Sequence, residues 1–182
     1  MGTIKPHPPV KLVCAITISK VELWPAVKQR LEDVFAEMDY LGEWYTFNHT
    51  RYYEPEMGPG LKKRLVAFRQ LIRAETLPDI KRTTHTIEDQ FRHNSQRQVN
   101  LDPGYIATAK FVLATTKDYD HRIYLGRGIF GDLHLRFRQK HFHPLEWTYP
   151  DYREPFVIQF LERVRVQYLT QLAEFYAKRL EK

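Results

Sequence analysis

The spacing of hydrophobic residues changes along the first half of the chain, and each spacing predicts a different element. The apolar, β-branched run 11–19 predicts a buried strand, and the alternating aromatic and threonine residues of 44–53 predict a second strand. Apolar residues three and four positions apart predict amphipathic helices over 21–38 and 61–72. The first half therefore alternates strand, helix, strand and helix.

Strands dominate the pattern of the second half. A short third helix, predicted from Thr84 or Thr86 to His93, comes first. Period-two alternation and short apolar runs then predict four strands, over 98–101, 105–115, 121–125 and 129–137. A long apolar stripe that includes Val157 and Leu161 predicts a helix running to the C-terminus.

This order of elements predicts an α+β domain. We expect a mixed, largely antiparallel sheet, with amphipathic helices covering one face and the long C-terminal helix lying on it. A doubly wound parallel sheet fits less well, because the second half lacks the crossover helices that parallel neighbours require. Segment 1–10 contains three prolines and predicts a flexible N-terminus, which leaves 11–182 as a single domain.

Composition narrows the class of protein. With 43% hydrophobic and 27% charged residues, the chain is neither disordered nor fibrous. No apolar run approaches the roughly 18 residues of a membrane span, so we expect a cytoplasmic protein without membrane contact. The single cysteine, Cys14, excludes an internal disulfide and reads as a buried, inert thiol. The net charge of +6 favours anionic partners only weakly, because a solvated basic surface is the more common reason for a charge of this size.

Standard catalytic and nucleotide-binding motifs are absent from the sequence. It contains no P-loop, no Gly-x-Ser-x-Gly elbow and no His-Glu-x-x-His helix. The string Gly-x-Gly-x-x-Gly occurs at 126–131, but a dinucleotide site needs a helix to begin there. Because 129–137 alternates like a strand, we interpret these glycines as a hairpin turn.

Three polar clusters at predicted strand ends and turns contain the candidate functional residues. Asp102 precedes Pro-Gly, where it either caps a turn or presents a carboxylate at a strand end. Segment 115–122 is either a solvated hairpin loop or a site that combines carboxylate, imidazole and cations. Segment 147–153 places aromatic rings and Arg153 at a helix N-terminus, where Asp151 is predicted as the cap.

Several stretches together resemble one bacterial family. The stretches are 50–58, 99–105, 110–118, 121–125 and 147–153, and the likeness extends over most of the chain. They are similar to the family called domain of unknown function 4416. The resemblance implies a cytosolic, single-domain bacterial protein with no established activity, and some similar members are labelled GTP-binding protein. The sequence has neither the P-loop nor the Asn/Thr-Lys-x-Asp guanine-reading motif that such a label implies.

The clusters lead to a hypothesis of ligand binding. We expect the protein to bind, and in an enzyme to turn over, a phosphate-bearing ligand such as a nucleotide or an RNA terminus. The predicted catalytic residues are His121, Asp118 and Asp102. The predicted ligand-binding residues are Lys117, Arg122, Arg153, Tyr53, Tyr105 and Tyr149.

Two other possibilities accompany this hypothesis. The first is a non-catalytic module that binds a protein partner through an exposed aromatic patch. The second is a metal site built on His134, His141 and His143, but histidines on an exposed strand are more often solvated than metallated. We therefore expect no bound metal and no cofactor.

Overall fold

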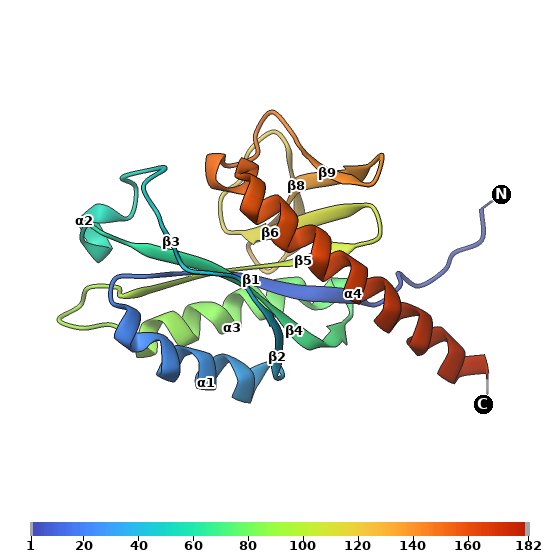
Figure 1. The fold of residues 1–182 in the computed structure, drawn as a ribbon, viewed down its shortest axis with the longest axis horizontal. Helices are drawn as coiled ribbons and strands as arrows, with labels where there is room; N and C mark the ends of the chain where they lie inside the picture. The colour runs from blue at the N-terminus through green and yellow to red at the C-terminus, as the bar shows by residue number, and fades with distance from the viewer. Residues whose placement is uncertain (1, 181–182) are drawn as a thin grey trace.

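The computed structural model describes residues 2–180 (Figure 1), so residues 181–182 of the predicted domain 11–182 lie outside the described residues. The strands are β1 (Val10–Ile18), β2 (Met38–Leu41), β3 (Tyr45–Thr46), β4 (Lys62–Ile72), β5 (Val99–Ala107), β6 (Lys110–Thr115), β7 (Arg122–Gly126), β8 (Ile129–Arg138) and β9 (His141–Pro144). The α-helices are α1 (Trp24–Val34), α2 (Glu54–Met57), α3 (Leu77–Gln90) and α4 (Pro155–Leu180), and short 3₁₀ turns cover Val21–Leu23, Ala74–Thr76 and Pro150–Arg153. None of the helices between residues 2 and 180 is both long and apolar enough to cross a membrane.

All the strands belong to one sheet of nine strands, which confirms the predicted α+β class. The strand order is β2-β4-β1-β5-β6-β8-β7, with β3 also paired to β4 and β9 to β8. Every strand pairing among the described residues is antiparallel. The glycines at 126 and 128 have φ of 104° and 77° in the β7–β8 turn, so the hairpin prediction is confirmed.

Helices cover both faces of the sheet, whereas one covered face was expected. Figure 1 shows α1 and α3 on one side of the central strands and α4 on the other. All nine residues of β1 are buried, with Cys14 facing α1 and α3 and Val13 facing α4. A central strand that is apolar on both faces needs cover on both sides. The predicted long C-terminal helix is confirmed as α4.

The helix predicted over 61–72 is wrong, because this segment is the strand β4. The apolar residues Leu65 and Phe68 are three apart, as on one helix face, but the strand directs them into opposite cores. Consecutive apolar residues arise here because β4 is paired on both edges and buried on both faces. Short apolar runs do not distinguish a buried strand from a helix.

Other predicted boundaries also change. In 44–53 only Tyr45–Thr46 forms a strand, and the rest is loop before α2. Helix α1 is shorter than the predicted 21–38, because the unpredicted strand β2 begins at Met38. Helix α3 begins at Leu77, earlier than the predicted start at Thr84 or Thr86. Strand β1 begins at Val10, within the N-terminal segment 1–10 that was predicted to be flexible.

Strand β5 separates from β6 halfway along its length, and this separation makes room for the candidate site. The two strands pair only from Gly104 to Ala107 on β5. A β-carbon at Gly104 would lie 2.4 Å from the Val112 carbonyl oxygen, so glycine permits this close crossing. Asp102 is therefore part of a continuous strand and not of the turn that Asp-Pro-Gly predicted.

Candidate functional site

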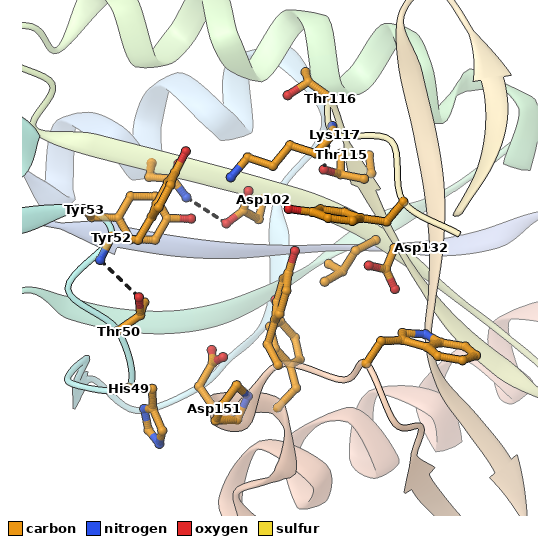
Figure 2. A pocket seen from close by; sticks show the side chains of 18 of the residues that line it. His49, Thr50, Tyr52, Tyr53, Asp102, Thr115, Thr116, Lys117, Asp132 and Asp151 are labelled. Carbon is orange, nitrogen blue, oxygen red and sulfur yellow. Dashed lines mark hydrogen bonds between the residues drawn. The ribbon is translucent and has the colours of Figure 1, made fainter. Parts of the chain in front are cut away.

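A cavity of about 590 Å³ lies beside the stretch where β5 has left β6 (Figure 2). Its walls come from the 47–53 loop, β4, α3, β5, the end of β6, the 116–121 loop, β8 and the 147–152 segment. All three predicted polar clusters reach it. The charged lining residues are Lys63, Lys81, Arg97, Lys117, Arg122, Asp102, Asp132 and Asp151.

The floor of the cavity is the α4-facing side of the sheet. On β5, Asn100 and Asp102 point to this side, while the alternate residues Val99 and Leu101 enter the core under α1 and α3. The Asn100 amide donates to Asp102 Oδ2 at 2.7 Å. The alternation of the strand therefore places a polar surface toward the cavity and an apolar one behind it.

Helix α3 satisfies the open edge of β5 with side chains. The Leu101 N–H donates to Glu88 Oε1 at 2.6 Å, and the Leu101 carbonyl accepts from Lys81 Nζ at 2.8 Å. Lys81 Nζ also lies 3.1 Å from Asp102 Oδ1. Burial alone would raise the pKa of Asp102, but the Lys81 and Lys63 charges outweigh it and lower that pKa. Asp102 is therefore ionised at neutral pH.

Lys63 and Asp151 form a second ion pair at the cavity wall. Lys63 Nζ lies 2.6 Å from Asp151 Oδ2, and both side chains are almost completely buried. The ammonium group also lies 4.7 Å from the Phe47 ring centre and 4.9 Å from that of Tyr152. Asp151 is thus an ion-pair partner, and the helix cap that was predicted for it is wrong, since α4 begins at Pro155.

Asp132 on β8 is the acceptor for three side chains. Arg122 Nε donates to Asp132 Oδ2 at 3.0 Å, His121 Nε2 lies 3.3 Å from the same oxygen, and His134 Nδ1 lies 3.1 Å from Oδ1. Burial would raise the pKa of Asp132, but the hydrogen bond from His134 and the charge of Arg122 lower it overall. Asp132 therefore holds His121 and Arg122 in place as an ionised carboxylate.

The proton position on His134 follows from its neighbours. The Tyr149 N–H donates to His134 Nε2 at 3.1 Å, so this nitrogen is an acceptor and the proton resides on Nδ1, toward Asp132. Burial lowers the pKa of His134 and keeps the ring neutral. His134 is fully buried and orients Asp132 from behind the cavity wall.

Aromatic rings form the wall of the cavity next to Asp132. The His121 ring stacks on Trp147 at 4.8 Å between centres and on Tyr119 at 6.1 Å. The Trp147 indole N–H donates to the Leu133 carbonyl at 2.8 Å, which fixes the ring. The Tyr149 hydroxyl accepts from Arg122 at 2.8 Å. We call Tyr119, His121, Trp147 and Tyr149 the aromatic wall.

The opposite end of the cavity is formed by the 47–53 loop and a lysine. Lys117 Nζ lies 3.9 Å from the Tyr52 ring centre, and Figure 2 shows the lysine extended toward Tyr52 and Tyr53. The negative charge of Asp102, followed by burial, raises the pKa of Tyr53, so its hydroxyl stays protonated. We call Tyr52, Tyr53 and Lys117 the lysine end.

Six of the nine predicted site residues line this single cavity: Asp102, Lys117, His121, Arg122, Tyr53 and Tyr149. The other three do not. Asp118 is an exposed loop residue, and Tyr105 packs beside Leu77 and Val112. Arg153 donates to the carbonyl groups of Thr148, Leu145 and Glu146 and so supports the 145–152 segment from outside.

Several lining residues escaped the sequence interpretation. Lys63 lies in the segment 61–72, whose predicted helix gave no indication that its side chain would be buried at a cavity. Lys81 lies in the part of α3 that precedes the predicted start at Thr84 or Thr86. The signal for Asp132 was its position within the predicted strand 129–137, where a carboxylate that becomes buried requires a partner.

The predicted histidine cluster does not converge on the cavity. His134 is buried behind the wall, and His141 and His143 lie on β9, with His141 near Glu162. Across residues 2–180, no group of three or more His, Cys, Asp or Glu side chains is arranged to hold a metal ion.

Comparison with known proteins gives a family without an assigned activity. No curated protein and no solved structure matches the chain. The sequence model of the family described as Domain of unknown function (DUF4416) matches residues 8–168, which is most of the chain. The resemblance inferred from the scattered stretches is thereby confirmed, and the chain belongs to the DUF4416 family.

Proposed function

We propose that the cavity binds a phosphate-bearing ligand such as a nucleotide, or an RNA terminus that presents the same groups. The observation that carries the proposal is the convergence of five Lys or Arg side chains with an aromatic wall in one cavity. Cations attract phosphate oxygens, and aromatic faces stack on bases. The cavity volume of about 590 Å³ also lies within the common range of small-molecule sites.

The carboxylates of the cavity are compatible with an anionic ligand because each is already paired. Asp102 pairs with Lys81, Asp132 with Arg122, and Asp151 with Lys63. Paired carboxylates repel a phosphate much less than isolated ones. We also propose a cytoplasmic, bacterial protein, which the buried free thiol of Cys14 and the family resemblance support.

His121 is the best placed side chain for acid–base chemistry if the ligand is turned over. It lines the cavity, its Nε2 lies 3.3 Å from the ionised Asp132, and its Nδ1 lies 3.2 Å from the exposed Asp120. A carboxylate in the position of Asp132 orients an imidazole. Arg122 is engaged by Asp132, the Lys117 carbonyl and the Tyr149 hydroxyl, so we assign it a positioning role.

One observation favours the alternative of a protein-interaction module. The edge strand β7 exposes three consecutive apolar residues, with Ile123 72%, Tyr124 60% and Leu125 41% exposed. Exposed apolar edge strands are sites at which another chain can pair. None of these three residues lines the cavity, so both functions are compatible with one protein.

Calorimetric titration tests the proposal. We expect GMP, AMP or a short 5′-phosphorylated RNA to bind more tightly than millimolar at low salt. Raising the salt should weaken RNA binding steeply, because several counterions are released, and should weaken nucleotide binding much less. If none of these probes binds, the ligand proposal is wrong, and binding of a protein partner through the exposed residues of β7 becomes the better explanation.

A further inference from the structure

The five cations of the cavity are not equivalent. Four of them have a carboxylate partner within 3.5 Å: Lys63, Lys81, Arg97 and Arg122. Lys117 is the one lining Lys or Arg, within the described part of the chain, for which no ion pair occurs. Its ammonium group lies over the Tyr52 ring, where a neutral π-face holds it without neutralising its charge.

The uncompensated charge therefore lies at the lysine end. An incoming phosphate gains most where a cation is free, because elsewhere it must displace a carboxylate that is already paired. The Tyr53 hydroxyl is protonated at the same end and can donate to a phosphate oxygen.

The aromatic wall offers the opposite chemistry. The guanidinium next to it, that of Arg122, has a 2% exposed side chain and makes three hydrogen bonds to protein groups, among them the Tyr149 hydroxyl. Trp147 is held by its bond to Leu133 and stacked on His121, so its orientation is fixed before a ligand arrives. Figure 2 shows Asp132, to which His121 and Arg122 bind, on the side of the cavity opposite Tyr52 and Tyr53.

We infer that the cavity has two subsites and binds a nucleoside phosphate in one orientation, with the phosphate at the lysine end and the base against the aromatic wall. This inference rests on the proposed function and goes further, because it assigns Lys117 to the phosphate and Trp147 to the base. Asp102 lies between Tyr53 and Asp132 in Figure 2, where its carboxylate, already paired with Lys81, can accept a hydrogen bond from a sugar hydroxyl.

Two variants separate the subsites. Lys117→Met keeps an unbranched side chain of nearly the same length over Tyr52 and removes the charge, and Trp147→Leu removes the stacking surface. The probes are guanosine, GMP and pyrophosphate, titrated calorimetrically into each protein. Lys20→Met is the matched control, because Lys20 is an exposed lysine outside the cavity. Trp147→Phe keeps an aromatic ring but loses the bond to Leu133 and part of the stacking surface, so it tests stacking separately from folding.

The inference predicts a crossed pattern. Lys117→Met should weaken GMP and pyrophosphate about ten- to a hundredfold and leave guanosine unchanged, as expected for one charge-assisted contact. Trp147→Leu should weaken guanosine and GMP about five- to a hundredfold and leave pyrophosphate unchanged, while Trp147→Phe retains most of the affinity.

Failure of this inference is distinguishable from failure of the proposed function. If the wild-type protein binds GMP but both variants weaken all three probes equally, or neither weakens any, the two-subsite arrangement is wrong and phosphate binding stands. If the effects of Lys117→Met and Trp147→Leu are exchanged, the orientation is reversed and the assignment is overturned. If the wild-type protein binds none of the probes, both proposals are wrong.

Discussion

Lys81 of α3 places its ammonium group 3.1 Å from the Asp102 carboxylate of β5, although the helix packs on the face of the sheet opposite to α4. This contact is possible because β5 has separated from β6, which leaves the Leu101 edge free to bond with α3. Because this edge of β5 is not paired with β6, Lys81 can bond to the Leu101 carbonyl and to the Asp102 carboxylate at the cavity.

The Lys81 contact should contribute strongly to stability. Lys81→Met leaves the Leu101 carbonyl without its donor and Asp102 without its nearest cation, and we expect a loss of about 2–4 kcal/mol in the free energy of unfolding. Urea denaturation measures this loss. The variant Lys28→Met, which breaks a surface pair with Glu32, is the control and should lose less than about 1 kcal/mol. Equal losses in the two variants would contradict the role of Lys81.

The buried histidine predicts a pH dependence of stability. Because the pKa of His134 is lowered in the folded protein, the unfolded chain takes up a proton first as the pH falls below about 6.5. The free energy of unfolding should therefore be highest above this pH and decrease from about pH 6.5 toward pH 5. His134→Gln should show a smaller decrease over this interval, measured by urea denaturation at each pH.

The exposed His141 provides the control for this pH dependence. His141→Gln removes a surface histidine that contacts Glu162, and it should retain the wild-type decrease. A wild-type slope that survives unchanged in His134→Gln would show that His134 is not the titrating group.

Arg153 should behave as a structural residue and not as a ligand contact. Its guanidinium donates to three carbonyl groups of the segment that carries Trp147 and Tyr149. We expect Arg153→Met to lower the free energy of unfolding by about 1–3 kcal/mol. Guanosine affinity at the aromatic wall should then change less than in Trp147→Leu. Loss of pyrophosphate binding with unchanged stability would instead show that Arg153 contacts the phosphate.

Cys14 should not react in the folded protein. Its side chain is buried within β1, and burial raises the pKa of the thiol, so very little thiolate is available at neutral pH. An aromatic disulfide reagent should label it only after denaturation. Fast labelling of the native protein would mean that β1 or the core above it opens readily.

The sequence predicts elements well where a local signal defines them and less well where both faces are buried, since β1 is predicted as a strand but β4 is not. Helix α4 and the β7–β8 hairpin follow from an apolar stripe and from turn glycines, which are local signals. The strand β4 was taken for a helix because its two neighbours in the sheet, which lie far away in the sequence, determine its conformation. Local periodicity does not contain that information.

The site shows the same division. Asp102, Lys117 and His121 stood out because they are concentrated in short polar clusters. Lys63 and Lys81 did not, because each is a single charge in an amphipathic segment. Each is recognisable as a site residue only through its ion pair with a carboxylate on another element. Prediction of such pairs requires the strand order, which short-range patterns do not specify.

Binding of a nucleoside phosphate at the aromatic wall can be observed through the three tryptophan indole signals in a proton–nitrogen correlation spectrum. Trp147 lines the cavity, while Trp24 and Trp44 pack edge to face against each other outside it and serve as internal controls. On titration with GMP, we predict that the Trp147 indole signal shifts in a saturable manner and that the other two stay in place. A Trp147 signal that does not move at millimolar GMP, or three signals that move together, would show that GMP does not bind at the aromatic wall.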